Sequence, residues 1–122
     1  MAVLSVFIGG GMGSLARYAL GLIFPYQKGF PWATFCANLA AAFILGVVMG
    51  WLVKQNPEAA YGNNMKCLLV TGFCGGFSTF SSFSNETLAM IKQQQWTLAA
   101  IYVALSLLLS ILAVAAGMQL KF

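Results

Sequence analysis

The sequence contains very few charged side chains. Its six Lys and Arg residues and two acidic residues make up 7% of 122 residues, whereas soluble globular domains carry about 25%. A soluble fold of this length cannot cover its surface with so few charges. Intrinsic disorder is excluded as well, because 61% of the residues are hydrophobic. These counts predict a membrane protein, with the bilayer as its solvent.

Histidine is absent, and cysteine is present only in an odd number. Cys36, Cys67 and Cys74 all lie in apolar stretches, so we expect no disulfide framework and interpret them as small packing residues. Their spacing does not match a metal site. The sequence also offers no nucleophile–base pair on which an enzyme mechanism could rest. The formal net charge of +4 comes from scattered basic residues, which argues against a nucleic-acid partner.

Four long apolar segments account for most of the sequence. A transmembrane helix needs about 20 mostly apolar residues, so the chain has room for four such helices and for no soluble domain. The expected spans are approximately 3–24, 32–53, 65–91 and 96–118, within a single transmembrane domain over residues 1–122. The N-terminus lacks the basic region of a signal peptide, and the first span is therefore expected to be retained. The fold class predicted is an all-α membrane protein with four transmembrane helices.

The basic residues in or beside the loops and in the C-terminal tail are divided almost evenly between the two sides of the membrane. With four spans, Lys54, Lys66 and Lys121 share one side, and Lys28 and Lys92 lie on the other. The positive-inside rule therefore favours neither orientation of the chain in the membrane by more than a small margin. Insertion in both orientations would allow an antiparallel dual-topology homodimer, which resembles the inverted repeats of transporters. A single orientation set by weak signals is equally compatible with this distribution.

The third span is poorly suited to a continuous helix. Gly72, Gly75 and Gly76 lie close together, and hydroxyl and amide side chains follow them up to Asn85. Irregular backbone at membrane depth is tolerated only where it is buried in protein or lines a watery cavity. Carriers and channels bind ions at such interruptions through freed carbonyl groups. We therefore predict a third helix broken at mid-membrane, and a glycine-rich packing contact is the alternative.

Aromatic rings alternate with the hydroxyl groups of this segment. Phe77, Phe80 and Phe83 recur every three residues and share one helical face. A packing stripe is the simpler interpretation of this spacing. The positive edges of the rings could also stabilise a small dehydrated anion.

The other spans carry isolated polar and small residues. In the fourth span, Tyr102, Ser106 and Ser110 are four residues apart and stack on one face, which predicts a polar track. Asn38 lies well inside the second span, where its amide needs a protein or water partner. Gly46, with Gly50 four residues later, predicts a close contact between helices.

Arg17 and Glu86 are the charged residues that fall inside spans. Ionisable groups within a membrane are functional candidates. Both residues lie near a span end, however, so snorkelling of the charged group to the interface would also explain them.

Three parts of the sequence, Gly9–Tyr18, Asn38 and Gly72–Glu86, together resemble the Fluc (CrcB-type) fluoride channels. The likeness covers the whole chain, and the third-span motif is its specific part. It implies a dual-topology homodimer with two antiparallel pores in the plasma (bacterial inner) membrane. Such a channel passively exports fluoride, lowers its cytoplasmic concentration and uses no organic cofactor.

The resemblance also implies roles for individual residues. In that family, two phenylalanines three apart follow the break and form an aromatic box along the pores, and they correspond to Phe80 and Phe83. The pore asparagine corresponds to Asn38, and the vestibule arginine to Arg17. The polar track, the hydroxyls beside the box and the supporting positions correspond to Tyr102, Ser106, Ser110, Ser81, Ser82, Thr79 and Glu86.

A structural sodium ion is a further implication of the resemblance. In the family it lies on the dimer axis, where main-chain carbonyls of the break from both subunits hold it. The corresponding carbonyls are those of Gly75 and Ser78. Oxygen-only ligation of this kind suits a hard cation.

Two other classes of protein compete with this prediction. A small multidrug-type exporter also has four spans and dual topology, and it exchanges protons for cations through a carboxylate in its first span. The only charge in the first span here is Arg17, although Glu86 keeps this alternative open. A non-transporting assembly subunit is the other alternative, and the polar run in the third span disfavours it.

Overall fold

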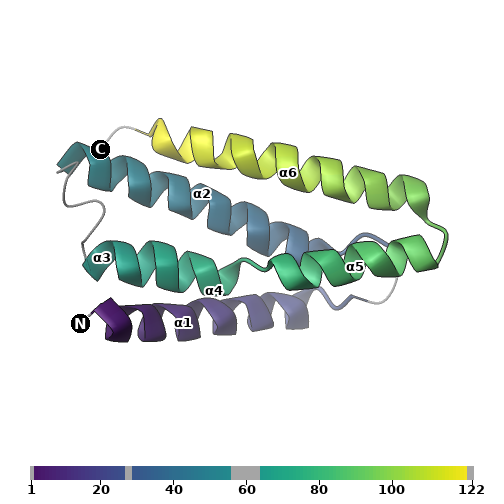
Figure 1. Ribbon diagram of the computed structural model, residues 1–122, viewed down its shortest axis with the longest axis horizontal. Helices are drawn as coiled ribbons and strands as arrows, with labels where there is room; N and C mark the ends of the chain where they lie inside the picture. The colour runs from purple at the N-terminus through teal and green to yellow at the C-terminus, as the bar shows by residue number, and fades with distance from the viewer. Residues whose placement is uncertain (1, 27–28, 56–63, 121–122) are drawn as a thin grey trace.

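The computed structural model describes residues 2–26, 29–55 and 64–120. This part of the chain is helical and contains no strand (Figure 1). Helices α1 (Ala2–Ile23), α2 (Trp32–Gln55) and α6 (Trp96–Met118) are each continuous. Between α2 and α6, four shorter elements follow one another: α3 (Asn64–Lys66), the π-helix η2 (Cys67–Cys74), α4 (Gly75–Phe77) and α5 (Phe80–Lys92).

Four helical segments of the described chain are long and apolar enough to cross a membrane. They are Ala2–Ile23, Trp32–Gln55, Asn64–Lys92 and Trp96–Met118. The predicted all-α architecture with four candidate spans is thereby confirmed for the described residues. Lys28 and Lys121 were counted when the basic residues on the two sides of the membrane were compared, and both lie outside the residues that the structure describes.

The helices pack as two pairs that lie side by side (Figure 1). Helix α2 packs mainly on α6, and α1 packs mainly on η2 and α4. Helix α5 continues past the end of α1 and packs on α6 near the α5–α6 turn. The interruption between α4 and α5 therefore lies where the two helix pairs meet.

Glycines allow the backbones within each pair to approach closely. A Cβ added to Gly13 of α1 would overlap the main chain of η2 and α4 at Phe73 and Phe77. A Cβ added to Gly50 of α2 would lie 3.0 Å from Met118 O of α6, and Gly46 is tighter still. The close helix contact predicted for Gly46 and Gly50 is confirmed, because small residues at these crossings let the helices touch through their backbones.

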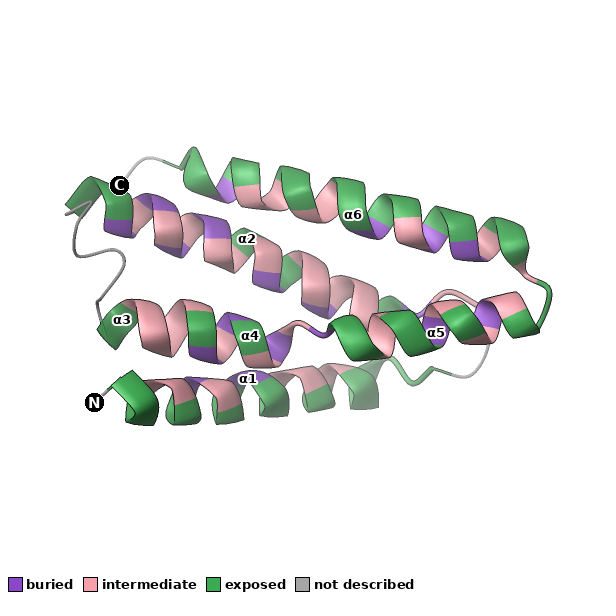
Figure 2. Ribbon diagram, viewed as in Figure 1, coloured by how far each residue is buried: buried purple, intermediate pink, exposed green. Residues whose placement is uncertain are grey.

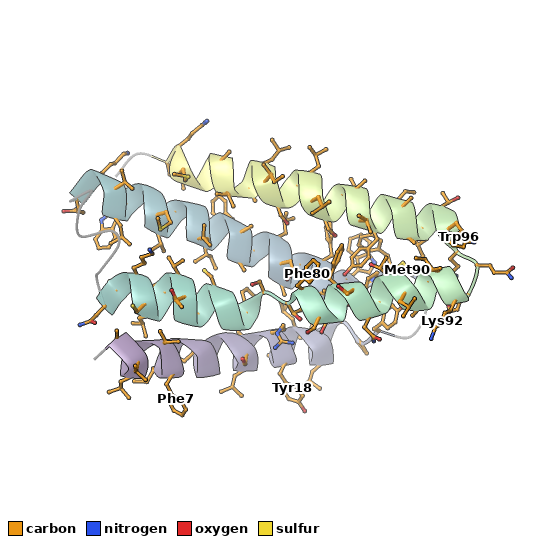
Figure 3. All side chains as sticks on the ribbon, viewed as in Figure 1. Phe7, Tyr18, Phe80, Met90, Lys92 and Trp96 are labelled. Atoms are coloured by element: carbon orange, nitrogen blue, oxygen red, sulfur yellow. The ribbon has the colours of Figure 1, made fainter. Side chains whose placement is uncertain are left out.

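Exposed residues follow the outer sides of the helices (Figure 2), and many of them are large and apolar. Phe7 is 77% exposed and Tyr18 is 67% exposed, and both point away from the other helices (Figure 3). Exposed apolar surface on this scale marks contact with lipid or with another protein. The chain is thus a multi-pass integral membrane protein.

The backbone leaves the helical conformation at two residues of the third segment. Helix α4 ends at Phe77, and Ser78 (φ −80°, ψ 157°) is extended. Thr79 (φ −150°, ψ 119°) is extended as well, and α5 begins at Phe80. The π-helix η2 immediately precedes this interruption, and π-helical segments are frequent at functional sites.

Candidate functional site

The amide of Asn38 fixes the interruption from the side of α2. Its Oδ1 accepts a hydrogen bond of 2.7 Å from the Thr79 N–H, and its Nδ2 donates one of 3.2 Å to Thr79 O. Both main-chain polar groups of Thr79 are thus paired, although the residue is only 9% exposed and belongs to neither helix. An extended residue inside a membrane protein requires such partners, since lipid supplies none.

Side chains also cap the two helix ends at the interruption. Thr79 Oγ1 accepts a hydrogen bond of 3.2 Å from the Ser82 N–H and caps the N-terminus of α5. The Ser78 N–H and Oγ both donate to Cys74 O, at 2.9 and 2.7 Å. From α1, Arg17 Nε donates a hydrogen bond of 3.1 Å to Gly76 O.

Two carbonyl groups beside the interruption lose the donors that a continuous helix would give them. In an α-helix, the Thr79 N–H would donate to Gly75 O and the Ser82 N–H to Ser78 O. Here these N–H groups donate to Asn38 Oδ1 and Thr79 Oγ1 instead. Gly75 and Ser78, whose carbonyls were expected to hold a cation, both line an open pocket of about 310 Å³. Freed carbonyl oxygens are suitable ligands for a hard cation such as sodium.

A second pocket, of about 280 Å³, lies between the interruption and α6. Its lining combines amide and hydroxyl groups with two phenylalanine rings, and none of its lining residues is charged. The lining residues are Asn38, Ser78, Thr79, Phe80, Phe83, Ser106, Leu107, Ser110 and Ile111. The structure thus brings together five of the residues predicted to form a pore, from three different helices: Asn38, Phe80, Phe83, Ser106 and Ser110.

The two phenylalanines differ in their surroundings. Phe80, at the start of α5 (Figure 3), is 78% exposed. Its ring centroid is 5.9 Å from that of Phe83. The Phe83 ring also lies 5.0 Å from the ring of Tyr102, with 50° between the ring planes. Phe83 therefore connects the rim of the pocket to the buried Tyr102.

Two hydroxyl groups of α6 are buried and unpaired. Tyr102 is fully buried and Ser106 is 8% exposed. Neither Tyr102 Oη nor Ser106 Oγ has a hydrogen-bond partner within the described residues. Buried polar groups are nearly always satisfied, so two unpaired hydroxyls are unusual. Ser106 lines the pocket and can donate to a ligand there, whereas Tyr102 lies behind Phe83 and does not line it.

Glu86 is buried close to the same region. It is 8% exposed, and its Oε2 accepts a hydrogen bond of 3.0 Å from Thr34 Oγ1. Its Oε1 has no partner in the described part of the chain. Thr34 was not among the residues predicted from the sequence, although it lies four residues before Asn38 and hence on the same face of α2.

Five residues predicted to form or flank the pore do not line this second pocket: Arg17, Ser81, Ser82, Glu86 and Tyr102. Ser81 is exposed, and its Oγ lies 3.3 Å from Thr79 Oγ1. Ser82 takes part through its N–H in the cap of α5. Arg17 is directed to Gly76 O, a partner that the sequence did not reveal.

Comparison with known proteins identifies relatives that match nearly the whole chain. Residues 4–118 match the family described as CrcB-like protein, Camphor Resistance (CrcB). A protein of Flavobacterium psychrophilum named fluoride-specific ion channel FluC is 39% identical over 115 residues, which cover 93% of this chain and 90% of that protein.

Relatives from other lineages agree with this match. Fluoride-specific ion channel FluC 1 of Mycobacterium tuberculosis is 42% identical over 111 residues, or 90% of this chain and 82% of that protein. Fluoride-specific ion channel FluC of Ignicoccus hospitalis is 36% identical over 119 residues, or 98% of this chain and 94% of that protein.

Proposed function

The chain belongs to the CrcB-like family, and on this basis we propose that it is a fluoride-specific ion channel rather than an enzyme. It lets fluoride leave the cell passively and so lowers the cytoplasmic concentration of the ion. The observation that carries this conclusion is the match of nearly the whole chain to relatives named fluoride-specific ion channels. The uncharged pocket beside the interruption supplies a chemical basis for it.

The pocket contains groups that can replace the hydration shell of fluoride. Fluoride is small and strongly hydrated, so a pore must offer hydrogen-bond donors in place of water. The Asn38 amide and the hydroxyls of Ser106 and Ser110 are such donors. The rings of Phe80 and Phe83 can present positive edges to the anion.

The absence of charge from the pocket lining favours conduction over tight binding. An ion must bind firmly enough to enter a pore and weakly enough to leave it. A cation in the lining would hold fluoride strongly, and none of the lining residues carries one. The unpaired Tyr102 hydroxyl continues the row of neutral donors beyond Phe83.

The working unit of the proposal is an antiparallel dual-topology homodimer with two pores. The near-even division of basic residues between the two sides supports insertion in both orientations. Ser78 is the central residue of the Asn64–Lys92 segment, which supports an interruption at mid-membrane. Phe80, at 78% exposed, borders a pocket that is open on one side, as expected if a second copy completes the pore.

A structural sodium ion between the two copies completes the proposal. The carbonyls of Gly75 and Ser78 in each copy would hold it, because their helical donors are engaged elsewhere. The bound ion would supply positive charge between carbonyl dipoles that otherwise repel each other across the dimer axis.

The alternative of a proton-coupled cation exporter is not supported. The relatives are named as fluoride channels, and helix α1 contains no acidic residue that could exchange protons. The acidic residue that kept this alternative open, Glu86, accepts a hydrogen bond from Thr34.

A growth experiment tests the proposed export. The chain is expressed in a bacterial strain that lacks its own fluoride exporter and is grown in medium containing fluoride. The wild-type chain is expected to restore growth, and the double variant Phe80→Ile/Phe83→Ile is expected to fail at equal abundance in the membrane. Failure of the wild-type chain to protect, despite its detection in the membrane, would contradict the proposal.

A further inference from the structure

Asn38 lies on the boundary between the two pockets described above. Together with Ser78, it lines both the pocket that holds Phe80 and Phe83 and the pocket that holds Gly75. One side of this boundary is the proposed anion path, and the other is the proposed sodium site. A change in the position of Asn38 would therefore alter both sites.

The contacts of the Asn38 amide suit a positioning role better than a role limited to ion binding. An asparagine amide offers one oxygen and two N–H donors. The oxygen and one donor are committed to the main chain of Thr79, 41 residues away in the sequence. A side chain that served only as an anion donor would need neither of these contacts.

The contact with the Thr79 N–H has a direct consequence for Gly75. In a helix that continued past Phe77, this N–H would donate to Gly75 O. Because it donates to Asn38 Oδ1 at 2.7 Å, Gly75 O remains available as a cation ligand. Removal of the amide would leave the Thr79 N–H without its partner, and pairing of this N–H with Gly75 O would continue α4 past Phe77 and occupy the proposed cation ligand.

From these contacts we infer that Asn38 is a positioning residue for the sodium site and couples that site to the anion pore. Its amide holds Thr79 extended, which keeps Gly75 O free on one side and places Phe80 at the pocket on the other. This inference rests on the sodium ion of the proposed function. It gives Asn38 a role beyond that of a donor to fluoride.

The sodium dependence of two properties tests the inference. Asn38→Ser is too short to reach Thr79, and Asn38→Leu keeps the size of the side chain without its amide. For each variant, the melting temperature in detergent and the fluoride efflux from proteoliposomes are measured against sodium concentration, with N-methylglucamine as the replacement cation. The melting temperature reports sodium binding independently of conduction.

The inference predicts weaker sodium binding in both Asn38 variants. Loss of two hydrogen bonds at the interruption is expected to raise the half-saturating sodium concentration by about tenfold in both measurements. Ser110→Ala is the matched comparison, because Ser110 lines the anion pocket but not the sodium pocket. It is expected to lower fluoride efflux and to leave the half-saturating sodium concentration unchanged.

Two results would overturn the inference, and they are distinguishable. If Asn38→Ser and Asn38→Leu lower efflux but keep the wild-type half-saturating sodium concentration, Asn38 acts only as a donor to fluoride. If the wild-type protein melts at the same temperature with and without sodium, the sodium site itself is wrong and the inference fails with it. Fluoride efflux from the wild-type protein then decides separately whether it is a channel.

Discussion

Arg17 Nε donates a hydrogen bond of 3.1 Å to Gly76 O and so joins the C-terminal third of α1 to α4. Arg17 is half-buried, and its partner is one of the carbonyls at a helix C-terminus, which favours a positive charge. With Asn38 on the opposite side, two helices hold the interruption. The guanidinium thus stabilises the backbone next to the proposed sodium site.

Replacement of Arg17 is therefore expected to lower stability. Arg17→Met keeps an apolar stem but removes the donor, and it should cost about 1.5–3 kcal/mol of unfolding free energy. Arg17→Lys should fall between this variant and the wild type, because an ammonium group lacks the planar donor geometry of Arg. Thermal unfolding in detergent measures both variants. If Arg17→Met melts at the same temperature as the wild type, the hydrogen bond to Gly76 O contributes nothing to the free energy of unfolding.

Variants of the two pocket phenylalanines, Phe80 and Phe83, should differ in their effects on conduction and on stability. Phe80→Ile and Phe83→Ile are each expected to reduce fluoride efflux by roughly tenfold or more, through loss of ring edges along the path. Phe83→Ile should also cost about 0.5–1.5 kcal/mol of stability, because Phe83 packs on the buried Tyr102. Phe80→Ile should cost less, because Phe80 is 78% exposed and its aromatic neighbour is the ring of Phe83. Efflux from proteoliposomes and thermal unfolding measure the two effects. Unchanged efflux in both variants would exclude the rings from the mechanism.

The hydroxyl of Tyr102 should matter for conduction and not for stability. It is buried and unpaired within the described residues, so Tyr102→Phe removes no hydrogen bond. The free energy of unfolding should stay the same or rise by up to about 1 kcal/mol, since an unsatisfied polar group is lost. Fluoride efflux should fall, because a donor is lost next to Phe83. Efflux equal to that of the wild type would show that the anion does not meet this hydroxyl.

Sequence patterns were sufficient for the features that depend on periodicity and composition. Apolar runs of span length predicted the four helical segments, because length and hydropathy decide which helices can cross a bilayer. The spacing of Gly46 and Gly50 predicted a close helix contact, because residues four apart share a helix face, and the structure shows α6 as the partner. The spacing of Ser106 and Ser110 placed both residues on the face of α6 that lines the pocket.

Contacts between distant segments could not be predicted in the same way. Arg17 pairs with a carbonyl 59 residues away, and every residue carries such a carbonyl. Composition therefore cannot indicate which one is chosen. Only the three-dimensional path of the chain determines this partner. Ser81 and Ser82 belong to the polar run but lie off the pocket, because residues one and two positions after Phe80 in α5 point to other faces than Phe80 and Phe83.

Two glycines of α1 provide a matched test of the helix packing. Gly13→Ala should destabilise the protein by about 1–3 kcal/mol, because its Cβ would overlap the main chain at Phe73 and Phe77. Gly11→Ala has open space around its Cβ and should be neutral or stabilising by about 0.5–1 kcal/mol. Thermal unfolding compares the two variants directly. Equal melting temperatures would contradict the close packing of α1 on η2 and α4.

The most direct test of the channel is ion efflux from proteoliposomes that contain the purified protein. Liposomes loaded with fluoride or with chloride are diluted into medium free of that anion, and an ion-selective electrode records its release. A potassium ionophore prevents the build-up of voltage in both cases. The account predicts rapid loss of fluoride and retention of chloride. Retention of fluoride, or release of chloride at the same rate as fluoride, would contradict it.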